Sequence, residues 1–182
     1  PLVLVVHYDF NEGSGTAIGN NGSASAGELV NAHAGAWVAE GSPDGSGYLN
    51  FTGDGAGTDA QHVATGLAGA DNPFVGSQDY TAMAWVRYDT VATGGNDDDK
   101  MIFGQAVDEN VLHLGARGNT YLQGHWGNDN TGGTISVNEW RHVAFRYQDG
   151  EQTILVDGEA IATDAKGGVT VDAEVVIGTT RS

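Results

Sequence analysis

The segment 121–129 holds the densest run of polar side chains that could bind a ligand. It reads YLQGHWGND, in which Gln123, His125 and Asp129 supply an amide, an imidazole and a carboxylate. Alternation along a strand places Gln123 and His125 on one face, and the residues at 127–129 are typical of a turn. A polar strand face that ends in an oxygen-rich turn is typical of a metal-assisted binding site. The competing interpretation is an ordinary strand with a solvated face.

The chain around this segment has the pattern of an all-β protein. Its 182 residues include 29 glycines and 3 prolines, and turn residues separate many short apolar runs. No window shows a sustained helical apolar repeat. We predict a single domain at residues 1–182, folded as a two-sheet antiparallel β-sandwich. The expected strands are 2–10, 36–39, 47–51, 61–64, 80–88, 100–105, 111–117, 121–126, 140–148, 152–156, 159–163 and 174–178, with a surface loop at 19–35.

The charge of the chain limits its partners. The net charge is −17, from 24 acidic and 7 basic side chains. Nucleic acid and anionic membranes attract positive charge, so neither is an expected partner. No apolar segment is long enough for membrane insertion. Cysteine is absent, which excludes disulfides and thiolate metal sites.

Two loops supply the oxygen ligands that a calcium ion at Asp129 would need. One is the acidic run at 97–99 and the other is the turn at 108–110. If 100–105, 111–117 and 121–126 form a meander, the turn at 108–110 lies at the same end as Asp129, and 97–99 lies at the opposite end. Both calcium models stay open. The two ligand sets are Asp129, Asn128, Asp108 and Asn110, or Asp129, Asp97 and Asp99.

The same strands predict a surface that binds a ligand. On 111–117, His113 and Arg117 should share one face. Lectin surfaces combine an aromatic platform with hydrogen-bonding side chains, and Trp126 is suited to the first role unless it lies in the core. A zinc site formed by two histidines and Asp129 is a weaker alternative. The predicted ligand-binding residues are His125, Trp126, Gln123, His113, Arg117 and Gln105. The other tryptophans, Trp37, Trp85 and Trp140, are predicted to be core residues.

The segment 139–162, EWRHVAFRYQDGEQTILVDGEAIA, makes a family resemblance specific. It resembles the paired strands near the end of laminin-G-like domains of the concanavalin A-like superfamily. Five further motifs lie in the order of that family: HYDFNEGSG at 7–15, GAW at 35–37, SGYLNFTGD at 46–54, YTAMAWVR at 80–87 and VIG at 176–178. The resemblance covers nearly the whole chain and implies a jelly-roll sandwich. It also implies calcium at the sandwich rim, without choosing between the two ligand sets.

The chain departs from this family pattern at one end. Such domains usually close with a strand rich in Asp, Val, Arg and Tyr, which pairs near the first strand. No such segment follows Gly178 in this sequence. Three explanations stay open: a truncated chain, a closing strand that lies beyond an inserted domain, or a sheet edge that is covered in another way.

A catalytic role is disfavoured. Glucanases with this fold use a Glu-x-Asp-x-Glu strand, which places three carboxylates on one sheet face. No Glu in this chain is followed two residues later by Asp, and Asp172 with Glu174 is the nearest pair. We therefore expect no enzyme activity.

These observations lead to one main functional hypothesis. We expect an extracellular, lectin-like module that binds a glycan or polysaccharide with the assistance of calcium. It would serve adhesion or substrate targeting as part of a larger secreted or cell-surface chain. The alternatives are a module that binds a protein or peptide, and a structural spacer that calcium stiffens.

Overall fold

The computed structural model describes residues 3–51, 60–91, 99–105, 112–125, 127–169 and 171–179. The regular secondary structure of this part of the chain is β-strand except for one short 3-10 helix, η2 (Gly69–Asp71), and no helix is long and apolar enough to cross a bilayer. The strands are β1 (Ala17–Ile18), β2 (Gly27–Val30), β3 (Trp37–Val38), β4 (Tyr48–Leu49), β5 (His62–Ala64), β6 (Tyr80–Val86), β7 (Lys100–Gln105), β8 (Leu112–Arg117), β9 (Thr120–His125), β10 (Asn130–Gly132), β11 (Arg141–Gln148), β12 (Glu151–Val156), β13 (Glu159–Ala165) and β14 (Val175–Ile177).

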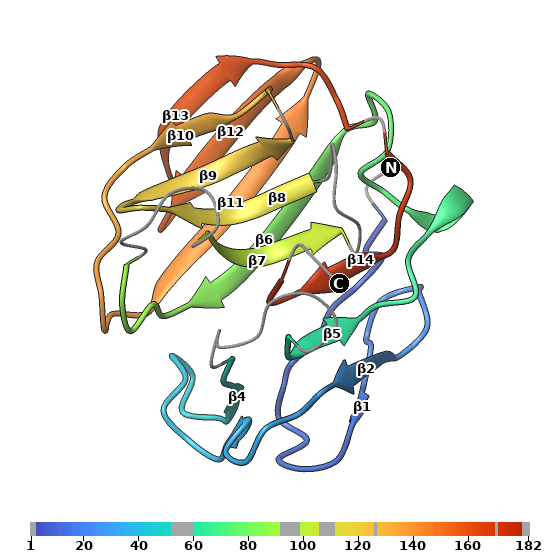
Figure 1. Ribbon diagram of the computed structural model, residues 1–182, viewed down its shortest axis with the longest axis vertical. Helices are drawn as coiled ribbons and strands as arrows, with labels where there is room; N and C mark the ends of the chain where they lie inside the picture. The colour runs from blue at the N-terminus through green and yellow to red at the C-terminus, as the bar shows by residue number, and fades with distance from the viewer. Residues whose placement is uncertain are drawn as a thin grey trace.

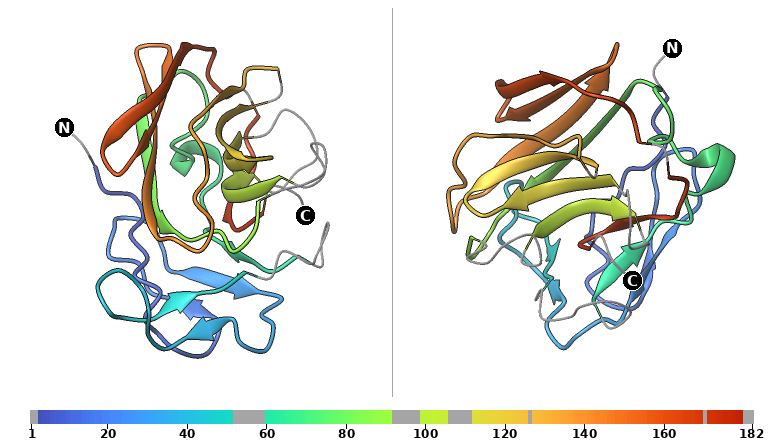
Figure 2. Two further views of the ribbon diagram at one scale, coloured as in Figure 1. Left: turned by 90° about the vertical axis from the view of Figure 1, so that its left-hand side faces the viewer. Right: turned by 45° about the horizontal axis from the view of Figure 1, so that its top comes forward.

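The strands form two large antiparallel sheets that pack face to face (Figures 1 and 2). The larger sheet has eight strands in the order β1-β2-β5-β14-β7-β8-β9-β10, and the smaller has four in the order β13-β12-β11-β6. The short strands β3 and β4 form a separate pair. The predicted two-sheet sandwich is confirmed. Strand β6 is an edge strand of the smaller sheet.

Two tight turns shape the smaller sheet. Asp149 and Gly150 join β11 to β12, and Asp157 and Gly158 join β12 to β13. All four residues have positive φ, between 51° and 86°. Two-residue hairpins of this type need φ above zero at both central positions, which explains the Asp-Gly sequence at each turn. Both hairpins predicted from the sequence are confirmed.

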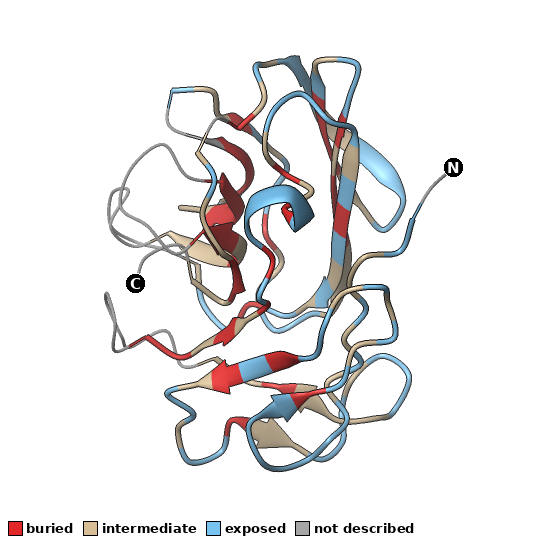
Figure 3. Cartoon of the chain, turned by 90° about the vertical axis from the view of Figure 1, so that its right-hand side faces the viewer, coloured by how far each residue is buried: buried red, intermediate tan, exposed pale blue. Residues whose placement is uncertain are grey.

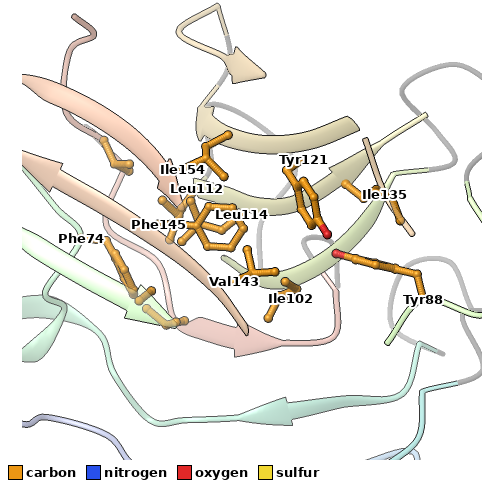
Figure 4. Packing of buried hydrophobic residues seen from close by; sticks show 14 of the residues in the cluster. Phe74, Tyr88, Ile102, Leu112, Leu114, Tyr121, Ile135, Val143, Phe145 and Ile154 are labelled. Atoms are coloured by element: carbon orange, nitrogen blue, oxygen red, sulfur yellow. The ribbon is translucent and has the colours of Figure 1, made fainter. Parts of the chain in front are cut away.

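The main core lies between the two sheets (Figure 4). Val143 and Phe145 on β11 alternate inward toward Leu112 and Leu114 on β8, and all four side chains are fully buried. Each such side chain contributes about 1.5–3 kcal/mol through removal of apolar surface from water. Figure 3 shows the buried residues along the inner sides of both layers. This core fixes which residues of β8 and β11 face outward.

Several predicted boundaries were wrong. Residues 3–10 form no strand, and their polar backbone groups bond to the irregular segment 20–24, where the side chain of Asn20 accepts from the N–H of His7 and donates to the carbonyl of Val5. The predicted loop at 19–35 contains β2, whose Leu29 is buried. Strand β10 was also missed. Its three residues are too short to show an alternating pattern.

Trp37, Trp85 and Trp140 were all predicted to be core residues, and this prediction was wrong. Trp85 on β6 is 53% exposed, and Trp37 and Trp140 are only partly buried. The alternation of β6 explains Trp85, because Ala82 points into the core and Trp85, an odd number of residues away, points outward.

Candidate functional site

The outer face of the eight-stranded sheet carries a compact group of charged side chains. On β8, Leu112 and Leu114 face the core, so His113 and Arg117 face outward. This confirms that His113 and Arg117 share a face. We call the group formed by these two residues with Asp99 and Asp129 the charged cluster.

Arg117 is the centre of the charged cluster. Its Nε and Nη2 donate to the carboxylate of Asp99, at 2.7 to 3.1 Å, and its Nη1 donates to Oδ2 of Asp129 at 2.6 Å. Charge-assisted bonds of this kind are stronger than neutral ones, and the planar guanidinium fixes their directions. About a quarter of the Arg117 and Asp129 side chains stays exposed to solvent, at 29% and 24%.

His113 completes the cluster from the other side of Asp129. Its Nε2 lies 2.6 Å from Oδ1 of Asp129, and its side chain is almost fully buried. Opposite His113 on β9 is Gly124. A Cβ at Gly124 would lie 2.7 Å from Oδ1 of Asp129, so only glycine lets the carboxylate lie over the sheet here. The positive φ of Gly127, 81°, belongs to the turn that brings Asp129 back to this position.

Hydrogen bonds keep Asp129 ionised. Its burial alone would raise the pKa of the carboxyl group. The bonds and charges of His113 and Arg117 outweigh this effect, and the pKa of Asp129 is lower than its ordinary value. The pKa of Arg117 is raised, first by the hydrogen bond to Asp99. Both partners therefore stay charged at neutral pH.

Asp99 and Asp129 belong to one cluster, although the predicted meander places them at opposite ends of the sheet. Asp99 precedes β7, at the opposite end of the sheet from the turn before Asp129, as predicted. Both nevertheless bind Arg117, because the turn folds Asp129 back over β9 and the long guanidinium side chain covers the remaining distance. Their positions at opposite ends of the sheet therefore do not prevent Asp99 and Asp129 from binding the same arginine.

Gln105 and Gln123 do not lie on this outer face. Both side chains are fully buried on the inner side of the sheet. Gln123 donates to the carbonyl of Arg146 on the opposite sheet, and Gln105 bonds to the backbone of Val171 and Leu112. The alternation was assigned correctly within each strand, but the polar side of β9 faces inward. These two amides hold buried backbone groups, so the surface role predicted for them is corrected.

Other predicted residues lie outside the part of the chain that the structure describes. These are Trp126, Asp97, Asp108 and Asn110, and the side chain of His125. Asn128 lies in the turn before Asp129, where its carbonyl accepts a hydrogen bond from Gln152. The predicted roles of these residues remain predictions.

Asp99 and Asp129 do not fit a calcium site in this arrangement. Calcium is bound by carboxylate oxygens, but the oxygens of both residues face the nitrogens of Arg117 or His113. A guanidinium in contact with both carboxylates would repel the ion. The described residues contain no group of three or more His, Asp or Glu side chains placed to hold a metal. Calcium binding therefore stays a prediction that depends on the loops around Asp97 and Asp108.

Sequence reasoning missed the glycines beneath the charged cluster. Gly115 lies between His113 and Arg117, and a Cβ there would lie 2.3 Å from the carbonyl oxygen of Lys100. Gly124 makes room for Asp129 in the same way. Glycine inside a strand often marks a close approach of another chain segment, and this was the available signal.

Comparison with known proteins places the chain in a family. The family model described as concanavalin A-like lectin/glucanases superfamily, of the laminin G type, matches residues 57–182. No curated protein matches the chain.

Two solved structures are similar to the chain to different degrees. Domain 4 of AbnA, a GH43 extracellular arabinanase from Geobacillus stearothermophilus, was solved in complex with arabinotriose. It aligns with a TM-score of 0.67 and 18% identity, over 99% of this chain and 85% of that one. Domains LG4-5 of the mouse laminin alpha1 chain align over 59% of this chain and 33% of that one, with 10% identity and a TM-score of 0.35. The first likeness shows a shared fold. The match of the family model over residues 57–182 establishes that the chain belongs to the concanavalin A-like lectin/glucanase superfamily.

Proposed function

We propose that this domain is a non-catalytic carbohydrate-binding module that attaches a larger extracellular protein to a glycan. The observation that carries the proposal is the charged cluster, a set of charged donors and acceptors in a defined geometry on the outer side of the eight-stranded sheet, where Arg117 and Asp129 are partly exposed. The domain of the arabinanase with the same fold binds arabinotriose, which supports a saccharide as the ligand class.

The cluster has hydrogen-bonding capacity left for sugar hydroxyls. Among the described residues, the carboxylates of Asp99 and Asp129 engage three of the five N–H groups of Arg117. Each oxygen of Asp129 can accept a further bond. A hydroxyl both donates and accepts, so one sugar hydroxyl can bridge Arg117 and Asp129. Because the cluster is already ordered, little conformational entropy is lost on binding.

The electrostatics of the cluster support a non-catalytic role. A glycosidase needs one carboxyl group with a raised pKa as proton donor and a second carboxylate nearby. The pKa of Asp129 is lowered instead, so this group does not hold a proton at neutral pH. Asp99 is bound through both oxygens to Arg117.

Titration calorimetry with soluble polysaccharides tests the proposal. Arabinan, xylan and mixed-linkage glucan should be compared, each with calcium and with EDTA. We expect Asp129→Asn and Arg117→Gln to weaken binding of the preferred polysaccharide at least about tenfold, because each removes a charged hydrogen-bonding group. Asp164→Asn breaks the exposed ion pair with Lys166 and serves as the matched control, with unchanged affinity.

Four results would count against parts of the proposal. Binding that survives in both cluster variants would remove the charged cluster from the site. Absence of binding to every polysaccharide with calcium present would favour a protein-binding or spacer role. Release of reducing sugar by the isolated domain would overturn the non-catalytic assignment. Binding that EDTA leaves unchanged would exclude assistance by calcium.

A further inference from the structure

The outer face of the four-stranded sheet carries a second unusual surface. Thr81, Met83 and Trp85 on β6 pair directly with Arg146, Ala144 and His142 on β11. Because their chain neighbours such as Phe145 point into the core, these six side chains face outward. We call them the β6–β11 face.

The β6–β11 face exposes large apolar side chains. Met83 and Trp85 are 54% and 53% exposed, although they lie two residues apart on one strand. The ring of His142 contacts the indole of Trp85 in an edge-to-face arrangement, with 5.4 Å between the ring centroids. Contiguous apolar exposure of this kind is typical of a binding surface.

The charge on this face is opposite in sign to the net charge of the protein. The chain has 24 acidic and 7 basic side chains, yet the six positions of the face include an arginine, a histidine and no carboxylate. Arg146 forms no ion pair with any described residue, and its Nη2 bonds only to the hydroxyl of Thr153. Beyond Trp85, Arg87 extends the basic row and lies over the rings of Tyr48 and Trp140.

Three carboxylates near the face have partners, while Glu151 on β12 lies exposed on the same outer side, diagonal to Arg146. Asp89 pairs with Arg87, and Asp157 pairs with Arg141 and accepts from the N–H of His142. Asp79 borders a hollow of about 270 Å³ that Arg146 also lines, and its Oδ1 accepts from the N–H of Asp149. The six positions of the face are therefore cationic at the Arg146 end and aromatic at the Trp85 end, which is complementary to an anionic ligand with an apolar side.

We propose that the β6–β11 face binds an acidic polysaccharide, a chain of sugar rings that carry carboxylates. The C–H side of one ring stacks on Trp85, and a carboxylate further along the chain bonds to Arg146. Thr81 lies opposite Arg146 and four residues from Trp85, which corresponds to about 13 Å along the strand. A polymer spans this distance and a single sugar does not. The proposal shares its ligand class with the proposed function but uses the opposite sheet.

The test uses polygalacturonate and the same polymer with its carboxylates fully methyl-esterified. Titrations are run in EDTA, so that calcium cannot bridge the acidic polymer to the acidic protein. Salt is held at about 0.15 M, where a screening length of about 8 Å weakens repulsion from distant carboxylates. We expect binding to polygalacturonate and at least about tenfold weaker binding to the esterified polymer.

Substitutions assign the binding to this face. Trp85→Ala and Arg146→Gln should each weaken binding to polygalacturonate about tenfold, while Trp85→Phe keeps part of the affinity because a ring remains. Asp79→Asn should strengthen binding, because it removes a carboxylate beside Arg146. Val137→Ala and Lys166→Gln are the controls, since they change an exposed apolar and a partly exposed basic side chain elsewhere. Circular dichroism confirms that each variant is folded.

The outcomes separate this inference from the proposed function. Unchanged binding of polygalacturonate by both Trp85→Ala and Arg146→Gln would overturn the inference. So would equal affinity for the charged and the esterified polymer. Binding of neutral polysaccharides that depends on Arg117, without any binding of polygalacturonate, would refute this inference and support the proposed function. Loss of acidic-polymer binding only in the β6–β11 variants would support the inference even if the charged cluster binds nothing.

Discussion

The arginines on the outer faces of the two sheets differ in whether they have carboxylate partners. On the eight-stranded sheet, Arg117 is held by Asp99 and Asp129, and the cluster lies over glycines. On the four-stranded sheet, Arg146 has no carboxylate partner among the described residues and lies on the same face as exposed apolar side chains. Charges that pair with each other contribute to stability and keep part of their hydrogen-bonding capacity for neutral hydroxyls, whereas an arginine without a carboxylate partner can pair with an anionic ligand. Substitutions on the two faces should therefore affect different measurements.

The largest effect is expected from the glycines beneath the charged cluster. Gly115→Ala places a methyl group 2.3 Å from the carbonyl oxygen of Lys100, and backbone must move to accommodate it. We expect a loss of about 3 kcal/mol in the free energy of unfolding, measured by urea denaturation. Gly167→Ala is the matched control, because no atom lies within 4 Å of its added Cβ, and it should change stability by less than about 0.5 kcal/mol. Equal losses in the two variants would show that Gly115 is not a close-packing position.

A direct comparison of the two arginines should give the next largest difference. Arg117→Met leaves the carboxylates of Asp99 and Asp129 without the cation between them, and should cost about 2 kcal/mol. Arg146→Met removes a side chain without an ion pair among the described residues, and should change the free energy of unfolding by less than about 0.5 kcal/mol. Chemical denaturation of both variants at neutral pH measures the difference. Similar losses would contradict the contrast between the two faces.

The sequence was sufficient to predict the sandwich and most of its strands. Strands such as β7 and β12 alternate or run apolar between clear turns, and the Asp-Gly turns leave one geometry for each hairpin. It was harder to predict which side of each strand faces the core. Gln123 follows the correct alternation, but whether its side of β9 faces the core depends on contacts with Arg146, a residue 23 positions away. Strand periodicity gives the relative orientation of neighbours and cannot identify the buried side of a strand with polar residues on both faces.

For the same reason, only part of the charged cluster could be predicted from the sequence. His113 and Arg117 share a face because they are four residues apart on one strand, and short-range alternation is enough to show this. The contact of Asp99 with the group of Asp129 depends on how far a turn folds back and how far a guanidinium reaches. Such distances are set by Gly124 and by tertiary packing, which no local pattern encodes.

The smallest of the three effects concerns acid. The pKa of Asp129 is lower in the folded protein than its ordinary value, despite the opposing effect of burial, because His113 and Arg117 bind the carboxylate. The unfolded state therefore binds more protons than the folded state around its own pKa of about 3.9. The stability from this group is fully present above that pH and is lost as the pH falls toward the folded value. Asp129→Asn should remove this part of the pH dependence.

Urea denaturation of wild type and Asp129→Asn between neutral pH and acid measures this effect. The loss of stability in wild type should be steeper than in the variant below about pH 4. It should stay smaller than the loss caused by Arg117→Met, because protonation leaves the Asp99–Arg117 pair intact. Asp164→Asn removes a carboxylate that pairs with Lys166 outside the cluster and should keep the slope of wild type. Parallel curves for wild type and Asp129→Asn would mean that water satisfies the Asp129 carboxylate as well as the cluster does. In that case, charge pairing on the outer face of the eight-stranded sheet would contribute no more to stability than the unpaired charge of Arg146 does on the other sheet.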